Sequence, residues 1–269
     1  MQPALENPAK ERPSGASIVD VLAGARAALA FLTRIPCGRG PVREAALRWA
    51  PAWFPVVGCA LGAAGCTVFV GLQRAGSWVA AASTIAVLAF VTGAFHEDGL
   101  ADTADALGGA FHREKIFVIL KDSRIGSFGA TALVLSLLLR AAAMAKLGPL
   151  AIGGLLLGQT LSRTTPVWLM AALPYVTPAA DSRSSKLTSI GLPQALSATF
   201  SAGAVGYLLV LCKVVALHSM LVSLSLSAVV ALICGWRFYV RAGGFTGDFL
   251  GATQQVTEVA ILVGLAAIT

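Results

Sequence analysis

Charged side chains are scarce in this chain. Only 12% of its 269 residues are Asp, Glu, Lys or Arg, whereas a typical soluble domain has about 25%. Four stretches of 25, 21, 26 and 23 residues contain none of these four residue types, and they lie at 49–73, 75–95, 187–212 and 214–236. This scarcity excludes an ordinary soluble domain. Together with a mean hydropathy of +0.78, it favours a chain whose solvent is lipid.

Three further absences narrow the class of membrane protein. No series of segments of about ten residues alternates between apolar and polar side chains, so helices rather than a closed barrel are predicted to cross the membrane. The five cysteines form no CxxC pair, and neither a disulfide framework nor a zinc site is indicated. Residues 1–15 lack the apolar core of a signal peptide and are interpreted as a disordered cytoplasmic tail. Residues 16–269 then form a single membrane-embedded domain.

The charge-free runs predict an all-α, polytopic integral membrane bundle. About 20 apolar residues are enough for one helix to cross the bilayer core. We expect about seven transmembrane helices, preceded by an N-terminal interfacial helix at 17–35. The spans are predicted at 51–73, 75–95, 125–143, 147–173, 189–212, 214–236 and 252–268.

The basic residues orient these spans. If the N-terminus is cytoplasmic, 16 of the 20 Lys and Arg residues lie on the cytoplasmic side, as the positive-inside rule requires. The four exceptions fall in outer turns: Arg74, Arg140, Lys146 and Lys213. Arg163 and Arg237 are interpreted as anchors at cytoplasmic ends of spans. All 13 acids then lie on the cytoplasmic side, at the mouths of spans, so we expect an active site that faces the cytoplasm.

The segment HEDGLADTAD, residues 96–105, places four acids directly after the second predicted span. If the helix of that span continues, Asp98, Asp102 and Asp105 fall within an arc of about 60° on one face. Like charges at this spacing repel, which favours a bound cation. Mg²⁺ commonly binds one or two carboxylates together with substrate phosphates. His96 is a further candidate ligand or substrate contact, and a solvated acidic loop is the alternative.

Residues 113–130 add groups that suit a phosphorylated substrate. Arg113, Lys121 and Arg124 precede the third predicted span, and fixed cations of this kind bind phosphate oxygens. Asp122 lies among them. An ordinary basic loop beside the membrane is the alternative interpretation.

A glycine-rich loop between the last two predicted spans carries Asp248. This aspartate is predicted to lie on the same membrane face as the acidic segment and to supply a second metal or phosphate contact. Phosphate contacts within the loop are predicted for Gly244, Thr246 and Gly247. Arg34, near the interface, is either a snorkelling anchor or a substrate contact.

Five motifs of the chain, in order, resemble those of the cobalamin synthase family, the adenosylcobinamide-GDP ribazoletransferases. They are FLTRIP (31–36), FPVVGCALG (54–62), FHEDGLADTADALGG (95–109), KDSRIGSFG (121–129) and GGFTGDFLGA (243–252). The resemblance covers almost the whole chain and implies a protein of the bacterial inner membrane that catalyses a specific reaction. A ribose hydroxyl of α-ribazole, or of its 5′-phosphate, attacks the phosphorus next to the cobinamide arm of adenosylcobinamide-GDP. GMP leaves, and the product is adenosylcobalamin or its 5′-phosphate.

This resemblance gives the candidate residues expected roles. Mg²⁺ is expected to bind Asp98, Asp102, Asp105 and Asp248. Asp98 is the foremost catalytic candidate, and Asp102 or Asp122 is expected to take the hydroxyl proton. The substrates are expected to contact Arg34, His96, Arg113, Lys121, Arg124, Gly244, Thr246 and Gly247. Besides its substrates and the lipid bilayer, the chain is expected to have no nucleic-acid partner. The size of a corrinoid favours a wide cavity or a homodimer.

Two other functions fit parts of the pattern. CDP-alcohol phosphotransferases also place clustered aspartates at a membrane face, but two of their aspartates are four apart, whereas Asp102 and Asp105 are three apart. A cation transporter is expected to carry acids inside its spans. The acids of this chain are predicted at the mouths of spans instead, which disfavours transport.

Overall fold

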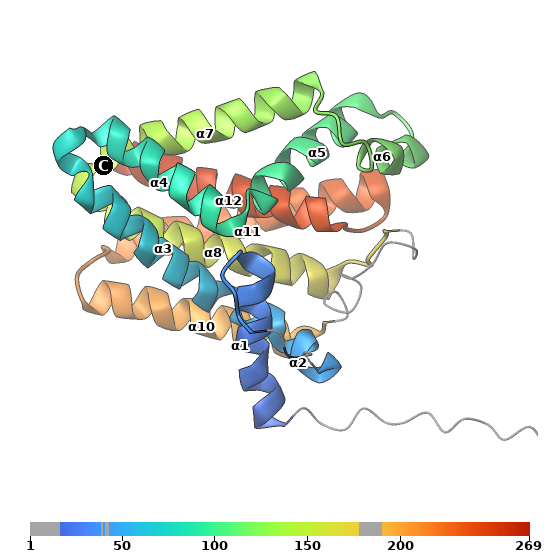
Figure 1. Ribbon diagram of the computed structural model, residues 1–269, viewed down its shortest axis with the longest axis horizontal. Coiled ribbons are helices and arrows are strands. Elements are labelled where there is room, and N and C mark those ends of the chain that lie inside the picture. Colours follow the sequence, from blue (N-terminus) through green and yellow to red (C-terminus); the bar gives the residue numbers. More distant parts are fainter. Residues whose placement is uncertain (1–16, 39, 41–42, 178–189) are drawn as a thin grey trace, which may run out of the picture.

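A computed structural model describes residues 17–38, 40, 43–177 and 190–269 as a bundle of α-helices (Figure 1). The part of the chain that it describes contains no strand, only an isolated bridge between Tyr175 and Phe245. The predicted all-α class is therefore confirmed. The predicted tail, 1–15, lies outside the described residues.

Long helices make up most of the bundle. They are α3 (Phe54–Gly71), α4 (Ser77–Thr92), α5 (Phe95–Gly109), α7 (Ser127–Leu147), α8 (Ala151–Ala172), α10 (Leu192–Leu211), α11 (Leu217–Ala242) and α12 (Gly247–Ile268). The remaining helices are α1 (Ile18–Leu32), α2 (Glu44–Trp49), α6 (Arg113–Ile119), η1 (Ala50–Trp53), η2 (Gln73–Ala75) and η3 (Gly148–Leu150). Helices α8 and α12 lie at the centre, where each packs against several others (Figure 1).

Several helical stretches are long and apolar enough to cross a membrane. Five pass on their own: Glu44–Gly71, Ser127–Ala172, Leu192–Leu211, Leu217–Ala242 and Gly247–Ile268. A sixth is added if the bent pair α4 and α5 is one span. The stretch Ser127–Ala172 consists of α7 and α8, and the chain reverses between them at η3 (Figure 1). The chain is thus a polytopic membrane protein, and the predicted spans correspond in order to α3, α4, α7, α8, α10, α11 and α12.

The second predicted span differs from expectation. Helix α4 has 16 residues and is about 24 Å long, shorter than a bilayer core of about 30 Å. Gly93 and Ala94 both adopt the left-handed conformation, with φ of 75° and 56°, and α5 leaves at 92° to α4. The helix of the second predicted span therefore does not continue into the acidic segment, and the acids lie on a new helix, α5.

Two arginines also lie elsewhere than predicted. Arg140 is not in an outer turn but is 2% exposed within α7, and Arg163 is 3% exposed within α8 rather than an anchor at its end. Arg140 forms ion pairs with Glu97 at 3.3 Å and with Glu258 at 3.4 Å. Glu258 lies near the middle of α12, so the prediction that acids occur only at the mouths of spans is also wrong.

Candidate functional site

The acidic segment meets the glycine-rich loop where α5 crosses α12. A Cβ atom at Gly99 would lie 2.8 Å from the carbonyl oxygen of Asp248 and 3.2 Å from the Cα of Gly251. Only glycine therefore allows the two backbones to approach this closely. Because Gly99 contacts the Asp248 backbone, the crossing brings Asp248 close enough to Asp98 and Asp102 for the three carboxylates to repel one another.

These carboxylates form an open acidic face. Asp98 is exposed, while Asp102 and Asp248 are half-buried. No group of three or more His, Cys, Asp and Glu side chains within the described ranges is already arranged to hold a metal ion. Mg²⁺ needs no such arrangement, because it usually binds one or two carboxylates and completes its shell with water and substrate phosphate oxygens. Hard, mutually repelling oxygen donors at an accessible face fit an ion that binds together with a diphosphate.

Asp105, although on the same helix face, is held by the start of α7. Its carboxylate accepts hydrogen bonds from the backbone N–H groups of Gly126 at 2.7 Å and Gly129 at 2.8 Å. A helix N-terminus favours an acid at this place. A Cβ at either glycine would collide with the Asp105 carboxylate, which accounts for both glycines of the KDSRIGSFG motif. Asp105 therefore joins α5 to α7, and Asp98, Asp102 and Asp248 remain more available to a ligand.

Arg113, one of the predicted phosphate-binding cations, lies against the start of the glycine-rich loop. A Cβ on Gly243 would be 2.9 Å from the Arg113 Nη2, and Gly243 has a φ of 78° at the end of α11. The guanidinium also lies 5.9 Å from the centre of the Phe117 ring. Arg113 is exposed, so its charge is open to a substrate beside the loop that leads to Asp248.

Asp122 and Arg124 form an exposed ion pair at 2.6 Å. Hydrogen bonds from the Arg124 side chain and backbone lower the pKa of Asp122 to about 2. A carboxylate with so low a pKa is a weak base at neutral pH. Of the two predicted proton acceptors, Asp102 is therefore the better candidate. Lys121 is exposed beside this pair.

The glycine-rich loop owes several of its residues to packing. Gly244 lies against the carbonyl group of Pro174, and Phe245 exchanges backbone hydrogen bonds of 2.9 and 3.0 Å with Pro174 and Val176. Thr246 caps α12 through its hydroxyl, which accepts a hydrogen bond from the Phe249 N–H at 3.3 Å. Gly244 and Thr246 are both buried. The packing of Gly244 and the capping role of Thr246 account for these two residues without a bound ligand.

Arg34 lies at the break between α4 and α5. Its backbone N–H donates to the carbonyl of Val91 at 2.8 Å, and its side chain packs against Gly93, where a Cβ would collide with it. The FLTRIP motif is thereby joined to the turn that starts the acidic helix. The side chain itself is exposed.

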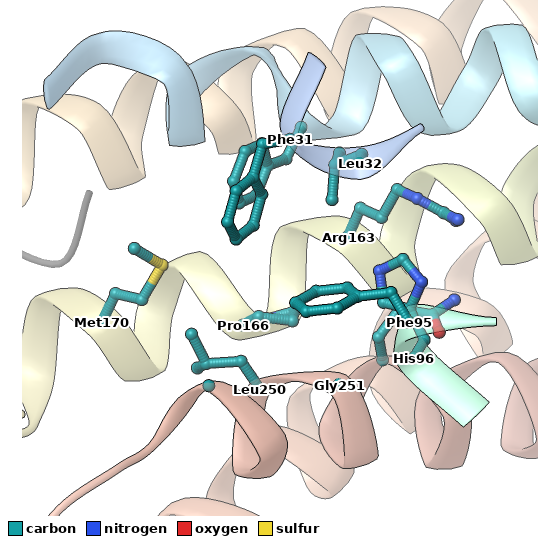
Figure 2. A pocket seen from close by; sticks show the side chains of 12 residues that line it. Phe31, Leu32, Phe95, His96, Arg163, Pro166, Met170, Leu250 and Gly251 are labelled. Atoms are coloured by element: carbon teal, nitrogen blue, oxygen red, sulfur yellow. The ribbon is translucent and has the colours of Figure 1, made fainter. Parts of the chain in front are cut away.

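His96 does not lie among the acids. It is 4% exposed and lines an apolar pocket enclosed by α1, α3, α5, α8 and α12 (Figure 2). The pocket is also lined by Phe31, Leu32, Phe54, Phe95, Arg163, Pro166, Met170, Gly247, Leu250, Gly251 and Gln254. Of the residues predicted to bind substrate, His96 and Gly247 lie here. The sequence analysis did not name Arg163 or Gln254 as site residues. A lone arginine in an apolar run is nevertheless a signal of a functional site.

The chain is similar to one family of known proteins over most of its length. The family described as cobalamin-5-phosphate synthase matches residues 24–266. A curated adenosylcobinamide-GDP ribazoletransferase of Albidiferax ferrireducens is 40% identical over 274 residues, which cover 88% of this chain and 95% of the relative. Enzymes of the same name from Sinorhizobium medicae and Shewanella amazonensis are 42% and 38% identical, each over 88% of this chain and over 94% and 92% of their own lengths.

No solved structure matches the chain. The sequence matches extend from α1 to α12 and include both sides of the α5–α12 crossing. This confirms the resemblance carried by the five motifs, and the chain belongs to the cobalamin-5-phosphate synthase family.

Proposed function

We propose that this chain catalyses the last assembly step of cobalamin, the transfer of α-ribazole or its 5′-phosphate to adenosylcobinamide-GDP, with Mg²⁺ bound at the α5–α12 crossing. The reaction follows from its family. The observation that carries the site is the backbone contact of Gly99 with Asp248, which gathers Asp98, Asp102 and Asp248 at one accessible face.

In this proposal one or two of the carboxylates of Asp98, Asp102 and Asp248 would hold the ion, and water and substrate oxygens would complete its shell. Bound there, Mg²⁺ would neutralise negative charge on the oxygens of the diphosphate as the reaction proceeds. Asp105 contributes by fixing α5 to the start of α7. The Asp105 carboxylate stays hydrogen-bonded to the N–H groups of Gly126 and Gly129. It contributes negative charge to the acidic face but does not bind the ion.

The remaining residues position the substrates and move one proton. A bond forms between the ribose oxygen and the phosphorus next to the cobinamide arm, and the bridging P–O bond to GMP breaks. Asp102 takes the proton of the attacking hydroxyl, while Arg113, Lys121 and Arg124 bind phosphate oxygens. Contacts with the substrates are also expected for Arg34 and Gly247. Arg34 lies beside the turn that precedes α5, and Gly247 is the first residue of α12.

The proposal also includes the cellular setting. Its site faces the cytoplasm of a bacterium, where nucleotide substrates are found, and the chain lies in the inner membrane. This orientation is supported by the excess of basic residues on one side of the predicted spans. Assembly as a homodimer, expected from the size of a corrinoid, is part of the same proposal.

Removal of the metal tests the proposed chemistry directly. Purified protein in detergent is incubated with adenosylcobinamide-GDP and α-ribazole, and released GMP is measured by liquid chromatography. We expect release with Mg²⁺, loss of release with excess chelator, and full recovery when Mg²⁺ is added back. Release that persists at the same rate in chelator would sink the metal assignment. A lack of release under every condition would sink the activity.

The α5–α12 crossing has its own prediction. Gly99→Ala forces a methyl group against the Asp248 backbone and moves the two helices apart. Displacement of reacting groups by about 1 Å costs about 100-fold in rate, so we expect GMP release to slow by about this factor. Gly203→Ala on α10 is the matched control, because its added methyl meets no atom of residues 17–38, 40, 43–177 and 190–269 within 4 Å. Equal rates for both variants would show that the close crossing does not set the site.

A further inference from the structure

The pocket at His96 has apolar walls and one polar end. Its walls are apolar and rich in aromatic rings. Phe31 and Phe54 are parallel, with ring centres 5.8 Å apart, and Phe95 meets Phe31 edge to face at 5.5 Å. Figure 2 shows Arg163 and His96 close together at one end, with Met170 at the other. Flat aromatic walls favour a flat apolar ligand.

Arg163 supplies a hydrogen-bond donor that no group in the described part of the chain uses. The side chain is 97% buried, being 3% exposed. Its Nη1 donates to the side-chain and backbone oxygens of Gln159 at 2.5 and 3.2 Å. Its Nε has no hydrogen-bond partner among the residues that the structure describes. A buried N–H without a partner is rare in proteins, and here the residue that carries it lines a pocket.

The pocket adjoins the acidic face. Gly247 lines the pocket, and the next residue, Asp248, belongs to the acidic face. Gly251 lies between the two, since a Cβ there would be 3.4 Å from both the Gly99 and the His96 Cα atoms. A ligand held in the pocket therefore lies on one side of α12, with the proposed metal on the neighbouring side.

We propose that this pocket binds the aromatic base of α-ribazole and that Arg163 Nε donates a hydrogen bond to the free ring nitrogen of that base. The inference rests on the proposed function and assigns its acceptor substrate to a place. The base is a dimethyl-substituted benzimidazole, which is flat, largely apolar and provided with one acceptor nitrogen. Its ribose would then extend past Gly247 towards the acidic face.

Other parts of the substrates fit the pocket less well. Guanine carries several donors and acceptors around its edge, and most would be left unpaired against phenylalanine and leucine walls, which is unfavourable. A lipid acyl chain would fill the apolar part but would leave the Arg163 donor unused. The corrin ring carries amide arms that require many polar partners.

A pocket-filling variant tests the assignment. Met170→Phe narrows the pocket at the end away from Arg163 and leaves the charged residues in place. We expect the KM for α-ribazole to rise by about 10- to 100-fold, the range for a steric change of this size in an apolar site. The KM for adenosylcobinamide-GDP and the kcat at saturating α-ribazole should stay near those of the wild type. Met220→Phe on α11, where Met220 contacts Gly206, is the matched control and should change neither KM.

A substrate analogue tests the hydrogen bond without changing the protein. In this analogue the free ring nitrogen is replaced by C–H, which removes the acceptor and keeps the shape. Because an apolar group would then face the Arg163 donor, we expect wild-type protein to use it with a KM at least about 10-fold higher. Equal use of both ribosides would overturn the contact with Arg163.

Equilibrium dialysis with labelled α-ribazole separates this proposal from the proposed function. Binding to wild-type protein that Met170→Phe weakens supports the pocket, whether or not GMP is released. Release of GMP by the wild type together with unchanged α-ribazole binding and KM in Met170→Phe would overturn the pocket alone. The pocket assignment would also be overturned if Met170→Phe raised only the KM for adenosylcobinamide-GDP. The same holds if Met170→Phe displaced a co-purified lipid but left the binding of α-ribazole unchanged.

Discussion

Replacing Asp98 by Asn is expected to slow GMP release by about 100- to 1,000-fold, the usual cost of removing one group that stabilises charge in the transition state. Asn keeps the shape of the side chain but removes the negative charge that holds the metal. Asp98 is exposed next to Gly99, at the closest approach of α5 to α12, so the change leaves the helix contact intact. The measurement is the initial rate of GMP release at saturating concentrations of both substrates.

Glu114→Gln provides the control for this variant. Glu114 is an exposed acid on the neighbouring helix α6, so the substitution makes the same change of charge away from the crossing. We expect it to leave the rate near that of the wild type. If Asp98→Asn also retained a near-normal rate with Mg²⁺ present, Asp98 would have no place in the metal site. A partial rescue of Asp98→Asn by high Mg²⁺ would support its role as a ligand.

The acidic face was largely predictable from sequence because it depends on local spacing. Asp98, Asp102 and Asp105 lie on one helix, and helical register alone places them on one face. The start of that helix was not predictable in the same way. The break depends on left-handed conformations at Gly93 and Ala94. Alanine rarely adopts this conformation, so the apolar run shows no signal of a 92° bend.

The separate role of Asp105 could not be read from spacing. Its partners are the N–H groups of Gly126 and Gly129, which lie 21 and 24 residues away in sequence. The same holds for Gly244, whose lack of a side chain is required by the carbonyl of Pro174. In both cases a glycine motif that is typical of phosphate binding serves the close approach of two chain segments. Sequence marks such a glycine but does not say what approaches it.

The burial of Arg140 and its partners was not predicted, because the positive-inside rule considers each charged residue without its partners. Arg140 was assigned to an outer turn on its sign and its place between two apolar runs. Its partners, Glu97 and Glu258, are 43 and 118 residues away, and only the packed bundle brings them together. Once paired, the charges no longer carry the cost that a lone ion has inside a membrane protein.

Removing Arg140 is therefore expected to cost more stability than any other single charge change considered for this chain. Arg140→Met leaves Glu97 and Glu258 buried, at 8% and 3% exposure, without their shared partner. Breaking a buried ion pair in this way costs about 3–5 kcal/mol. The free energy of unfolding is measured by titrating protein in mixed micelles with a denaturing detergent. Arg74→Met, an exposed position at η2, is the control and should have little effect.

A second substitution distinguishes lost pairing from lost packing. Glu97 and Glu258 are balanced by two buried arginines, Arg140, which forms an ion pair with each, and Arg163, which interacts with both electrostatically. In Arg140→Met this balance is lost, whereas adding Glu258→Gln restores it and keeps an acceptor for Gln254, which donates to Glu258 at 2.9 Å. We therefore expect the double variant to be more stable than Arg140→Met alone, with strong coupling between the two sites. Additive losses would mean that Arg140 stabilises the bundle by filling space, and that the charges of α5, α7 and α12 are held independently of one another.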